Sequence, residues 1–126
     1  MKKSKIIIIE DDESLVKLIS DILRDNGFDI SLIAPDDKLM QKIDKAHPDL
    51  ILLDIILSNQ SGFDVLEELK NNVSTKNIPI IILSNLGSAE EIRKGLQFGA
   101  VDYIVKTNHS MQEVVNRIKK VIKNKK

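Results

Sequence analysis

The 126 residues include 19 basic and 19 acidic side chains, so the overall charge gives no reason to expect binding to nucleic acid or to a membrane surface. The absence of cysteine excludes a disulfide framework, a thiolate metal site and a cysteine nucleophile. After MKKSK only four isoleucines precede EDDE, too few for a signal peptide, and no stretch approaches the ~20 apolar residues of a membrane span. We therefore expect one cytoplasmic domain that spans residues 1–126.

Short apolar runs recur along the chain and predict strands. Their continuous, β-branched character is typical of strands that are buried on both faces of a parallel sheet. In chain order they are Lys5–Ile9, Phe28–Ile33, Asp49–Leu53, Pro79–Leu83 and Val101–Val105.

Segments with the apolar spacing of helices lie between these runs. The first stripe extends from Leu15 to Leu23, and Gly27 stands where a helix stop belongs. Shorter stripes at Leu39–Ile43 and Phe63–Leu69 predict the second and third helices.

Two Ser-x-x-Glu motifs, at Ser88 and Ser110, have the capping-box pattern that opens a helix. Gly95 falls inside the first of these helices, where glycine costs up to ~1 kcal/mol relative to alanine, and it indicates either a soft switching helix or tight packing. Six basic and no acidic residues lie between Arg117 and Lys126. This run predicts the basic end of the last helix and a solvated tail, with binding of an acidic partner or nucleic acid as the alternative.

Five strands alternating with five helices predict an α/β fold with right-handed crossovers and helices on both faces of a parallel sheet. In such sheets, ligands bind outside the carboxyl ends of the strands. Glu10 and Asp11 follow the first predicted strand, and three further polar residues, Asp54, Ser84 and Lys106, follow the third, fourth and fifth.

Each of these polar residues has an ordinary explanation when it is taken alone. An acidic run suits the first turn of a helix, an aspartate suits a turn, a serine suits a helix cap, and a lysine is usually solvated. As a set, however, they are chemically complementary. Clustered carboxylates attract a hard cation such as Mg²⁺, and an aspartate beside such an ion and a lysine can act as a nucleophile towards a phosphoryl group.

The motifs IIIIEDDE, DIILSNQSGFD, PIIILSN and DYIVK occur in the order found in the receiver domains of two-component response regulators. The chain resembles this family over essentially its whole length, in the manner of a stand-alone chemotaxis-type or sporulation-type regulator. The resemblance implies a flavodoxin-like three-layer sandwich around a five-stranded parallel sheet of order 2-1-3-4-5.

By position, the resemblance implies that Asp54 is the phosphoacceptor. It also implies a Mg²⁺ site, with Mn²⁺ as a substitute, in which Asp11 and Asp54 bind through their carboxylates, Glu10 mainly through water, and Ile56 through its backbone carbonyl. Asp12 falls outside this set and is interpreted as a helix N-cap.

Three further residues match the rest of the family's site. Ser84 matches the hydroxyl position, Lys106 the invariant lysine, and Tyr103 the aromatic residue whose rotamer changes when the hydroxyl moves towards the phosphoryl group. Asp54, Ser84 and Lys106 are thus the predicted catalytic residues, and Ser84 and Tyr103 are the predicted switch.

Some positions depart from the family pattern. Thr107 stands where the lysine is usually followed by proline in a cis peptide, and a cis bond before threonine would cost about 2.5–4 kcal/mol. Ser58 and Ser61 replace a proline and an acidic residue in the loop after Asp54, although Gly62 is retained. Asn85 replaces a small residue and is expected to crowd the entrance of the site.

Ile56 and Leu86 stand at the two positions that influence hydrolysis in this family. Both are apolar, so neither can orient an attacking water molecule through a hydrogen bond. We therefore predict a relatively long-lived acyl phosphate.

The leading hypothesis is a signalling phosphoacceptor that catalyses only its own phosphorylation and dephosphorylation, and so is no enzyme in the ordinary sense. The resemblance implies a histidine kinase or histidine phosphotransfer protein as the phosphodonor, and a downstream protein target on the face formed by the fourth helix, the last strand and the last helix. It implies neither membrane binding nor direct binding to nucleic acid. The sequence leaves open whether phosphorylation produces a homodimer.

Three alternatives remain beside this hypothesis. The chain could be the receiver fragment of a larger response regulator, for example one that binds DNA. An aspartyl-nucleophile phosphatase of the haloacid-dehalogenase pattern needs a second aspartate where Ile56 stands. A flavin-binding carrier needs phosphate donors after the first strand, where EDDE would repel the phosphate.

Overall fold

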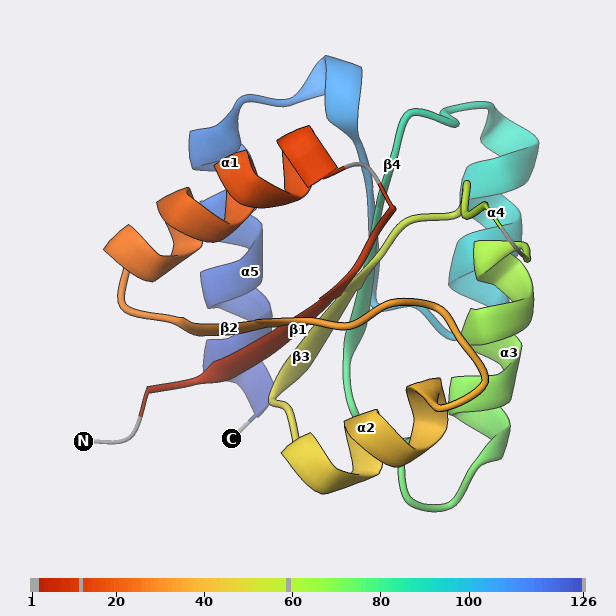
Figure 1. Cartoon of the computed structure of the whole chain (residues 1–126). Coiled ribbons are helices and arrows are strands. Elements are labelled where there is room, and N and C mark those ends of the chain that lie inside the picture. The colour runs from red at the N-terminus through yellow and green to blue at the C-terminus, as the bar shows by residue number, and fades with distance from the viewer. Residues whose placement is uncertain (1–2, 12, 59, 126) are drawn as a thin grey trace.

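The computed structural model describes residues 3–11, 13–58 and 60–125, and its five strands form one parallel sheet in the order β2-β1-β3-β4-β5 (Figure 1). The strands are β1 (Lys5–Ile9), β2 (Asp29–Leu32), β3 (Leu50–Leu53), β4 (Ile80–Ser84) and β5 (Asp102–Val105). The helices are α1 (Glu13–Asp25), α2 (Leu39–Ala46), α3 (Gly62–Asn71), α4 (Ala89–Gln97) and α5 (Met111–Lys125), with a 3₁₀ turn η1 (Lys106–Asn108). The predicted flavodoxin-like fold is confirmed.

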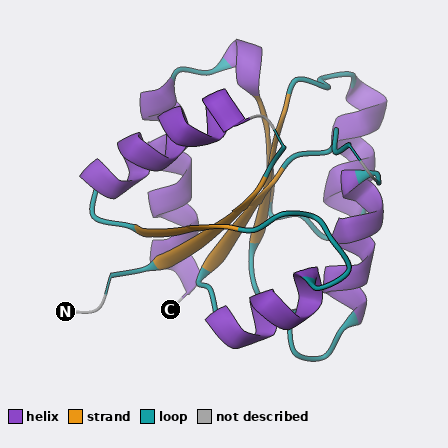
Figure 2. Ribbon diagram, in the orientation of Figure 1, coloured by secondary structure: helices purple, strands orange, loops and turns teal. Residues whose placement is uncertain are grey.

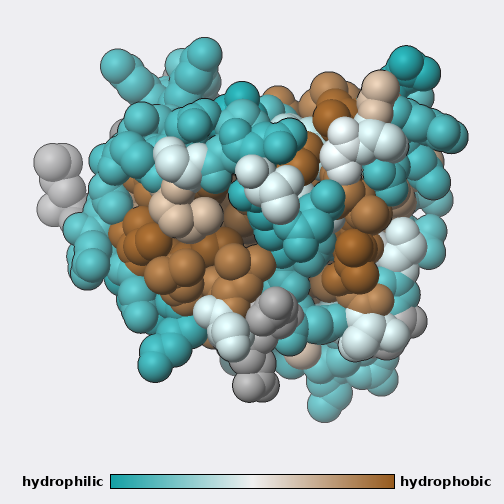
Figure 3. All heavy atoms as spheres, turned by 90° about the horizontal axis from the view of Figure 1, so that it is seen from above, coloured by the Kyte–Doolittle hydropathy of each residue, from teal (hydrophilic) through white to brown (hydrophobic). Residues whose placement is uncertain are grey.

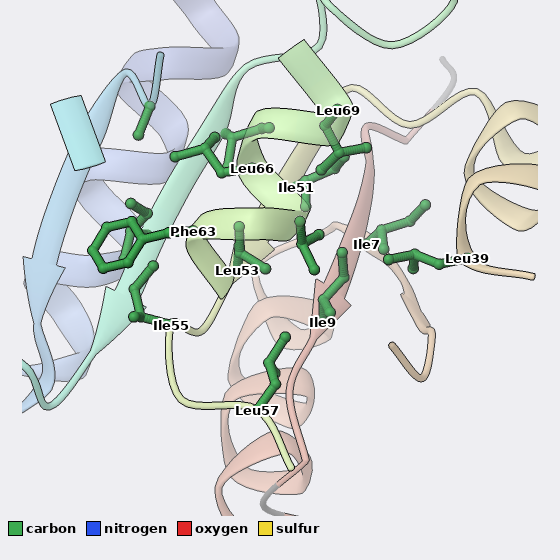
Figure 4. Packing of buried hydrophobic residues seen from close by; sticks show 14 of the residues in the cluster. Ile7, Ile9, Leu39, Ile51, Leu53, Ile55, Leu57, Phe63, Leu66 and Leu69 are labelled. Carbon is green, nitrogen blue, oxygen red and sulfur yellow. The ribbon is translucent and has the colours of Figure 1, made fainter. Parts of the chain in front are cut away.

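Helices cover both faces of the sheet, which explains why its central strands are apolar throughout (Figure 2). On one face, α1 and α5 pack against the side chains of Ile6, Ile8 and their neighbours. On the other face, the apolar side chains of α2 and α3 pack against Ile7 and Ile9, as Figure 4 shows. Among the described residues, no helix is both long and apolar enough to cross a bilayer.

The predicted strands are correct in number and order, but several of them begin or end one residue away from the predicted position. Phe28, Ile33, Asp49 and Val101 lie just outside the strands, although Phe28 and Ile33 are buried in the core. Ser84, which was expected after the fourth strand, is its last residue. The backbone amides of Ile33, Asp49 and Val101 still donate hydrogen bonds to neighbouring strands, so the pairing continues one residue beyond these strand ends.

The predicted helix signals are present where the structure describes them. Gly27 follows α1 with φ +90°, the left-handed conformation that glycine adopts without strain. The Ser88 hydroxyl and the Glu91 carboxylate form a reciprocal capping box at the start of α4, and Ser110 and Glu113 exchange the same two hydrogen bonds before α5. The N-cap predicted at Asp12 lies outside the described residues.

The structure settles two details near the C-terminus that the sequence left open. The Lys106–Thr107 peptide bond is trans, so the threonine is accommodated without the cis bond that the family pattern suggests. Helix α5 continues to Lys125, so the segment 117–126, expected as the basic end of the last helix followed by a tail, is mostly helix. Within it, Arg117 lies 3.4 Å from the carboxylate of Asp102 and is not free positive charge.

Gly95 is buried in α4 and faces the sheet. A Cβ atom at this position would lie 2.6 Å from Cδ1 of Ile82 and 2.9 Å from Cδ2 of Tyr103. Of the two interpretations of this glycine, the structure favours tight packing between α4 and strands β4 and β5.

Candidate phosphoacceptor site

The register of the sheet brings the polar residues together at its carboxyl edge. Ile9 pairs with Leu53, so the residues that follow them, Glu10 and Asp54, leave the sheet side by side. The ladder continues one step further, because the Asp54 amide donates to the carbonyl of Ile9 at 3.1 Å. Figure 3 looks down on this edge and shows hydrophilic surface crossing the middle between two hydrophobic patches.

Lys106 follows β5 and reaches across the edge to two carboxylates. Its Nζ lies 3.0 Å from Oε2 of Glu10 and 3.2 Å from Oδ2 of Asp54. The exposed fractions of the three side chains are only 11% for Lys106, 8% for Glu10 and 7% for Asp54. Because little water screens these charges, the ammonium is a strong electrostatic partner for both carboxylates.

The environment of Asp54 keeps its carboxyl ionised. Burial raises its pKa, but the charge of Lys106 and the hydrogen bonds from the Ile56 amide and from Lys106 outweigh this effect and hold the pKa below its usual value. The Ile56 amide donates to Oδ1 of Asp54 at 3.1 Å, while Oδ2 contacts Lys106. An ionised carboxylate held at both oxygens is the form required of a nucleophile.

Asp11 lines the same cleft as Glu10, Asp54 and Lys106. Its carboxylate accepts a hydrogen bond from the backbone amide of Ser58, in the loop after Asp54. The cleft has a volume of about 410 Å³, and its lining includes Glu10, Asp11, Asp54, Ile56, Ser58, Asn85 and Lys106. The interaction between Asp11 and the Ser58 amide had no sequence signal, because it depends on the path of the loop rather than on the side chain of Ser58.

Gly62 determines the path of that loop. Its amide donates to the carbonyl of Ile55 at 2.8 Å, and a Cβ atom here would collide with the carbonyl oxygen of Asp54 and with Cα of Ile55. Only a residue without a side chain allows this approach, which explains why glycine stands at the start of α3. Within the loop before Gly62, an isolated antiparallel bridge pairs Ile56 with Ser61.

Ser84 and Tyr103 lie behind the cleft rather than in its lining. Ser84 is fully buried, and its Oγ accepts a hydrogen bond from the Leu86 amide at 3.3 Å. The ring of Tyr103 is buried, its hydroxyl donates to the Leu86 carbonyl at 2.6 Å, and burial raises the pKa of this phenol. The two predicted switch residues are thus joined through one residue of the loop after β4.

The donor atoms of the cleft fit a hard divalent cation, because Glu10, Asp11 and Asp54 offer carboxylate oxygens and Ile56 a backbone carbonyl. Within the part of the chain that the structure describes, no three His, Cys, Asp or Glu side chains are grouped so that they could hold a metal ion.

Comparison with known proteins identifies the same type of domain. Residues 6–119 match the family model of the response regulator receiver domain. The chain is 34% identical over 119 residues to the phosphate regulon transcriptional regulatory protein PhoB of Escherichia coli strain K12, a match that covers 94% of this chain and 52% of PhoB. The chain thus spans about half the length of the curated relatives it matches.

Two solved structures extend the comparison. The BeF3-activated N-terminal receiver domain of Klebsiella pneumoniae RstA has a TM-score of 0.85 and 28% identity, and the match covers 94% of this chain and 98% of that one. A two-component response regulator from Clostridium difficile has a TM-score of 0.87 and 25% identity, with 96% and 97% of the two chains covered.

Proposed function

The chain belongs to the response regulator receiver domain family, and we propose that Asp54 is the residue on which it accepts a phosphoryl group. The observation that carries this proposal is the position of Lys106, whose ammonium contacts Glu10 and Asp54 at 3.0 and 3.2 Å inside one cleft. The donor is a phosphohistidine of a histidine kinase or of a histidine phosphotransfer protein.

The reaction is a transfer between two nucleophiles. A carboxylate oxygen of Asp54 forms a bond to phosphorus while the P–N bond of the phosphohistidine breaks, and the imidazole nitrogen retains the electron pair and takes up a proton. Lys106 is then placed to exchange its contact with Asp54 for one with a phosphoryl oxygen, which neutralises charge on the transferred group. The domain catalyses only its own phosphorylation and dephosphorylation.

We assign a Mg²⁺ requirement to the same cleft. Glu10, Asp11 and Asp54 would hold the ion together with the backbone carbonyl of Ile56, and Mn²⁺ would serve in its place. The bound ion supplies positive charge that offsets the charges of the carboxylates and of the phosphoryl group. The chain itself supplies the nucleophile, Asp54, and the ammonium group of Lys106, which keeps the ionised carboxylates close together.

Phosphorylation is proposed to change the face formed by α4, β5 and α5, where a downstream protein binds. This step is supported by the chain of contacts in which Ser84 and Tyr103 both bond to Leu86. Movement of Ser84 towards a phosphoryl oxygen would pull on the Leu86 amide and release the Tyr103 hydroxyl. The added charge of the phosphoryl group would thereby shift the equilibrium between two conformations of the face formed by α4, β5 and α5.

The whole chain is proposed to act as one cytoplasmic receiver domain, residues 1–126. A second candidate, the receiver part of a longer transcriptional regulator, is favoured by the match to only about half of PhoB. Both candidates share the same chemistry at Asp54. They differ in whether the changed surface contacts a separate protein or another domain of the same one.

Intact-mass measurement after incubation with acetyl phosphate and Mg²⁺ tests the proposal. We expect a gain of one phosphoryl group that disappears in Asp54→Asn and in excess EDTA. Glu68→Gln, at an exposed site on α3, is the matched control and should gain the group as the unaltered chain does. Equal gains in the unaltered chain and in Asp54→Asn would reject Asp54 as the acceptor.

A further inference from the structure

A second cleft lies between α1 and the end of β2, with a volume of about 490 Å³. This is within the size range of clefts that bind small molecules. Its apolar lining comes from Val16 on α1 and from Leu32, Ile33 and Ala34 on the opposite wall. Leu32 is 52% exposed, so β2 presents a large apolar side chain to solvent beside the cleft.

The cleft also contains a buried hydroxyl that has no partner. Ser20 is 1% exposed and lines the cleft, and its Oγ is the only buried side-chain polar atom without a hydrogen bond among the residues that the structure describes. Buried polar atoms without a partner are rare in folded proteins and call for an explanation. Because this hydroxyl has no hydrogen bond to break, rotation about χ1 towards a ligand sacrifices none.

Charge is distributed unevenly along the cleft. Arg24 lies one turn beyond Ser20 on α1, and Lys17 lies on the preceding turn. The Arg24 guanidinium has only distant contacts, 3.5 Å to the carbonyl of Ile30 and 3.9 Å to the carboxylate of Asp21. Glu10 lines the cleft as well and brings negative charge to it from the end of β1.

We propose that this cleft binds small amphipathic monocarboxylates. The ligand's carboxylate would accept hydrogen bonds from the Ser20 hydroxyl and the Arg24 guanidinium, a charge-assisted arrangement, with Lys17 adding positive charge. Its alkyl chain would lie against Val16 and Leu32, which would cover apolar surface that β2 leaves exposed. Attraction to Arg24 would place the carboxylate at that end of the cleft, away from Glu10, whose carboxylate is already paired with Lys106.

Titration of the ¹⁵N-labelled chain with sodium octanoate, followed by two-dimensional amide NMR, tests the site. We expect saturable one-site shifts confined to the amides of α1 and of residues 32–34. Octan-1-ol and octylammonium have the same alkyl chain but lack the carboxylate, and each should bind at least about tenfold more weakly. Shifts that do not saturate, that spread to the apolar residues of α4, or that are equal for octan-1-ol would overturn the proposal.

Substitutions localise the binding. Ser20→Ala and Arg24→Gln should each weaken octanoate binding by about tenfold, as expected for loss of a hydrogen bond to a charged group. The matched control Arg93→Gln, at an exposed site on α4, should bind as the unaltered chain does. Asp54→Asn should also bind octanoate normally, so the outcome is independent of the phosphoacceptor chemistry. Unchanged affinity in both cleft variants would contradict the assignment.

Discussion

The positive charge of Lys106 lies between two carboxylates that are almost fully buried. Lys106→Met would leave Glu10 and Asp54 together without this countercharge, and breaking a buried ion pair in this way costs roughly 3–5 kcal/mol of folding free energy. Urea denaturation without added metal measures the loss. The control Lys120→Met, at an exposed site on α5, should change stability by less than about 0.5 kcal/mol. Equal stability of the two variants would show that the Lys106 contacts contribute little.

Two apolar side chains should set the lifetime of the phosphorylated state. Ile56 is 55% exposed beside Asp54, and Leu86 is partly buried in the loop after β4, so neither can position an attacking water molecule. Ile56→Asn combined with Leu86→Glu should shorten the half-life of the acyl phosphate by roughly tenfold or more, because the new side chains can hydrogen-bond to water. Loss of the phosphoryl mass with time measures the half-life. A change of less than twofold would argue against this explanation.

Individual site residues were predictable to different degrees. Glu10, Asp54 and Lys106 could be placed on one edge because parallel topology follows from the apolar runs, and the ends of those runs are clear in the sequence. The burial of the Ser20 hydroxyl could not be predicted. In the sequence, Ser20 is one of several polar residues in the segment that forms α1. Its hydroxyl is buried only because the helix packs against the sheet.

Helix α4 packs against the sheet at a single glycine, Gly95. Gly95→Ala would raise helix propensity by up to ~1 kcal/mol, but the added methyl group would meet Ile82 and the ring of Tyr103, and overpacking typically costs 1–3 kcal/mol. We expect net destabilisation in thermal unfolding, whereas Gln97→Ala, at an exposed position on the same helix, should be neutral or slightly stabilising. A more stable Gly95→Ala variant would show that α4 can move away from the sheet without cost.

The elements themselves were predictable because their signals are local. Capping boxes at Ser88 and Ser110 and the stop at Gly27 depend on neighbouring residues, and all three are present in the structure. The close packing of Gly95 is different, since its contacts come from β4 and β5 and no local pattern contains them. The basic end of the last helix was predicted as well, but the residue at which it ends was not, because a run of lysines carries no local stop signal.

For the whole molecule, metal binding and folding should be coupled. A ligand that binds only the folded chain stabilises it by about 2.7 kcal/mol at a hundred times its dissociation constant. Mg²⁺ should therefore raise the melting temperature of the unaltered chain in a concentration-dependent way. Asp11→Asn should reduce this effect, and Asp64→Asn, at an exposed site on α3, should not. An equal Mg²⁺ effect in all three proteins would place the ion elsewhere.

The chemistry proposed for the carboxyl edge depends on one covalent bond, and reductive trapping tests that bond most directly. After phosphorylation with acetyl phosphate and Mg²⁺, borohydride reduces an aspartyl phosphate to homoserine, and peptide mass spectrometry locates the altered residue. We predict homoserine at Asp54 and an unaltered aspartate at Asp11. Homoserine at Asp11, or a stable phosphoryl group on another side chain with Asp54 intact, would contradict the assignment of Asp54 as the nucleophile.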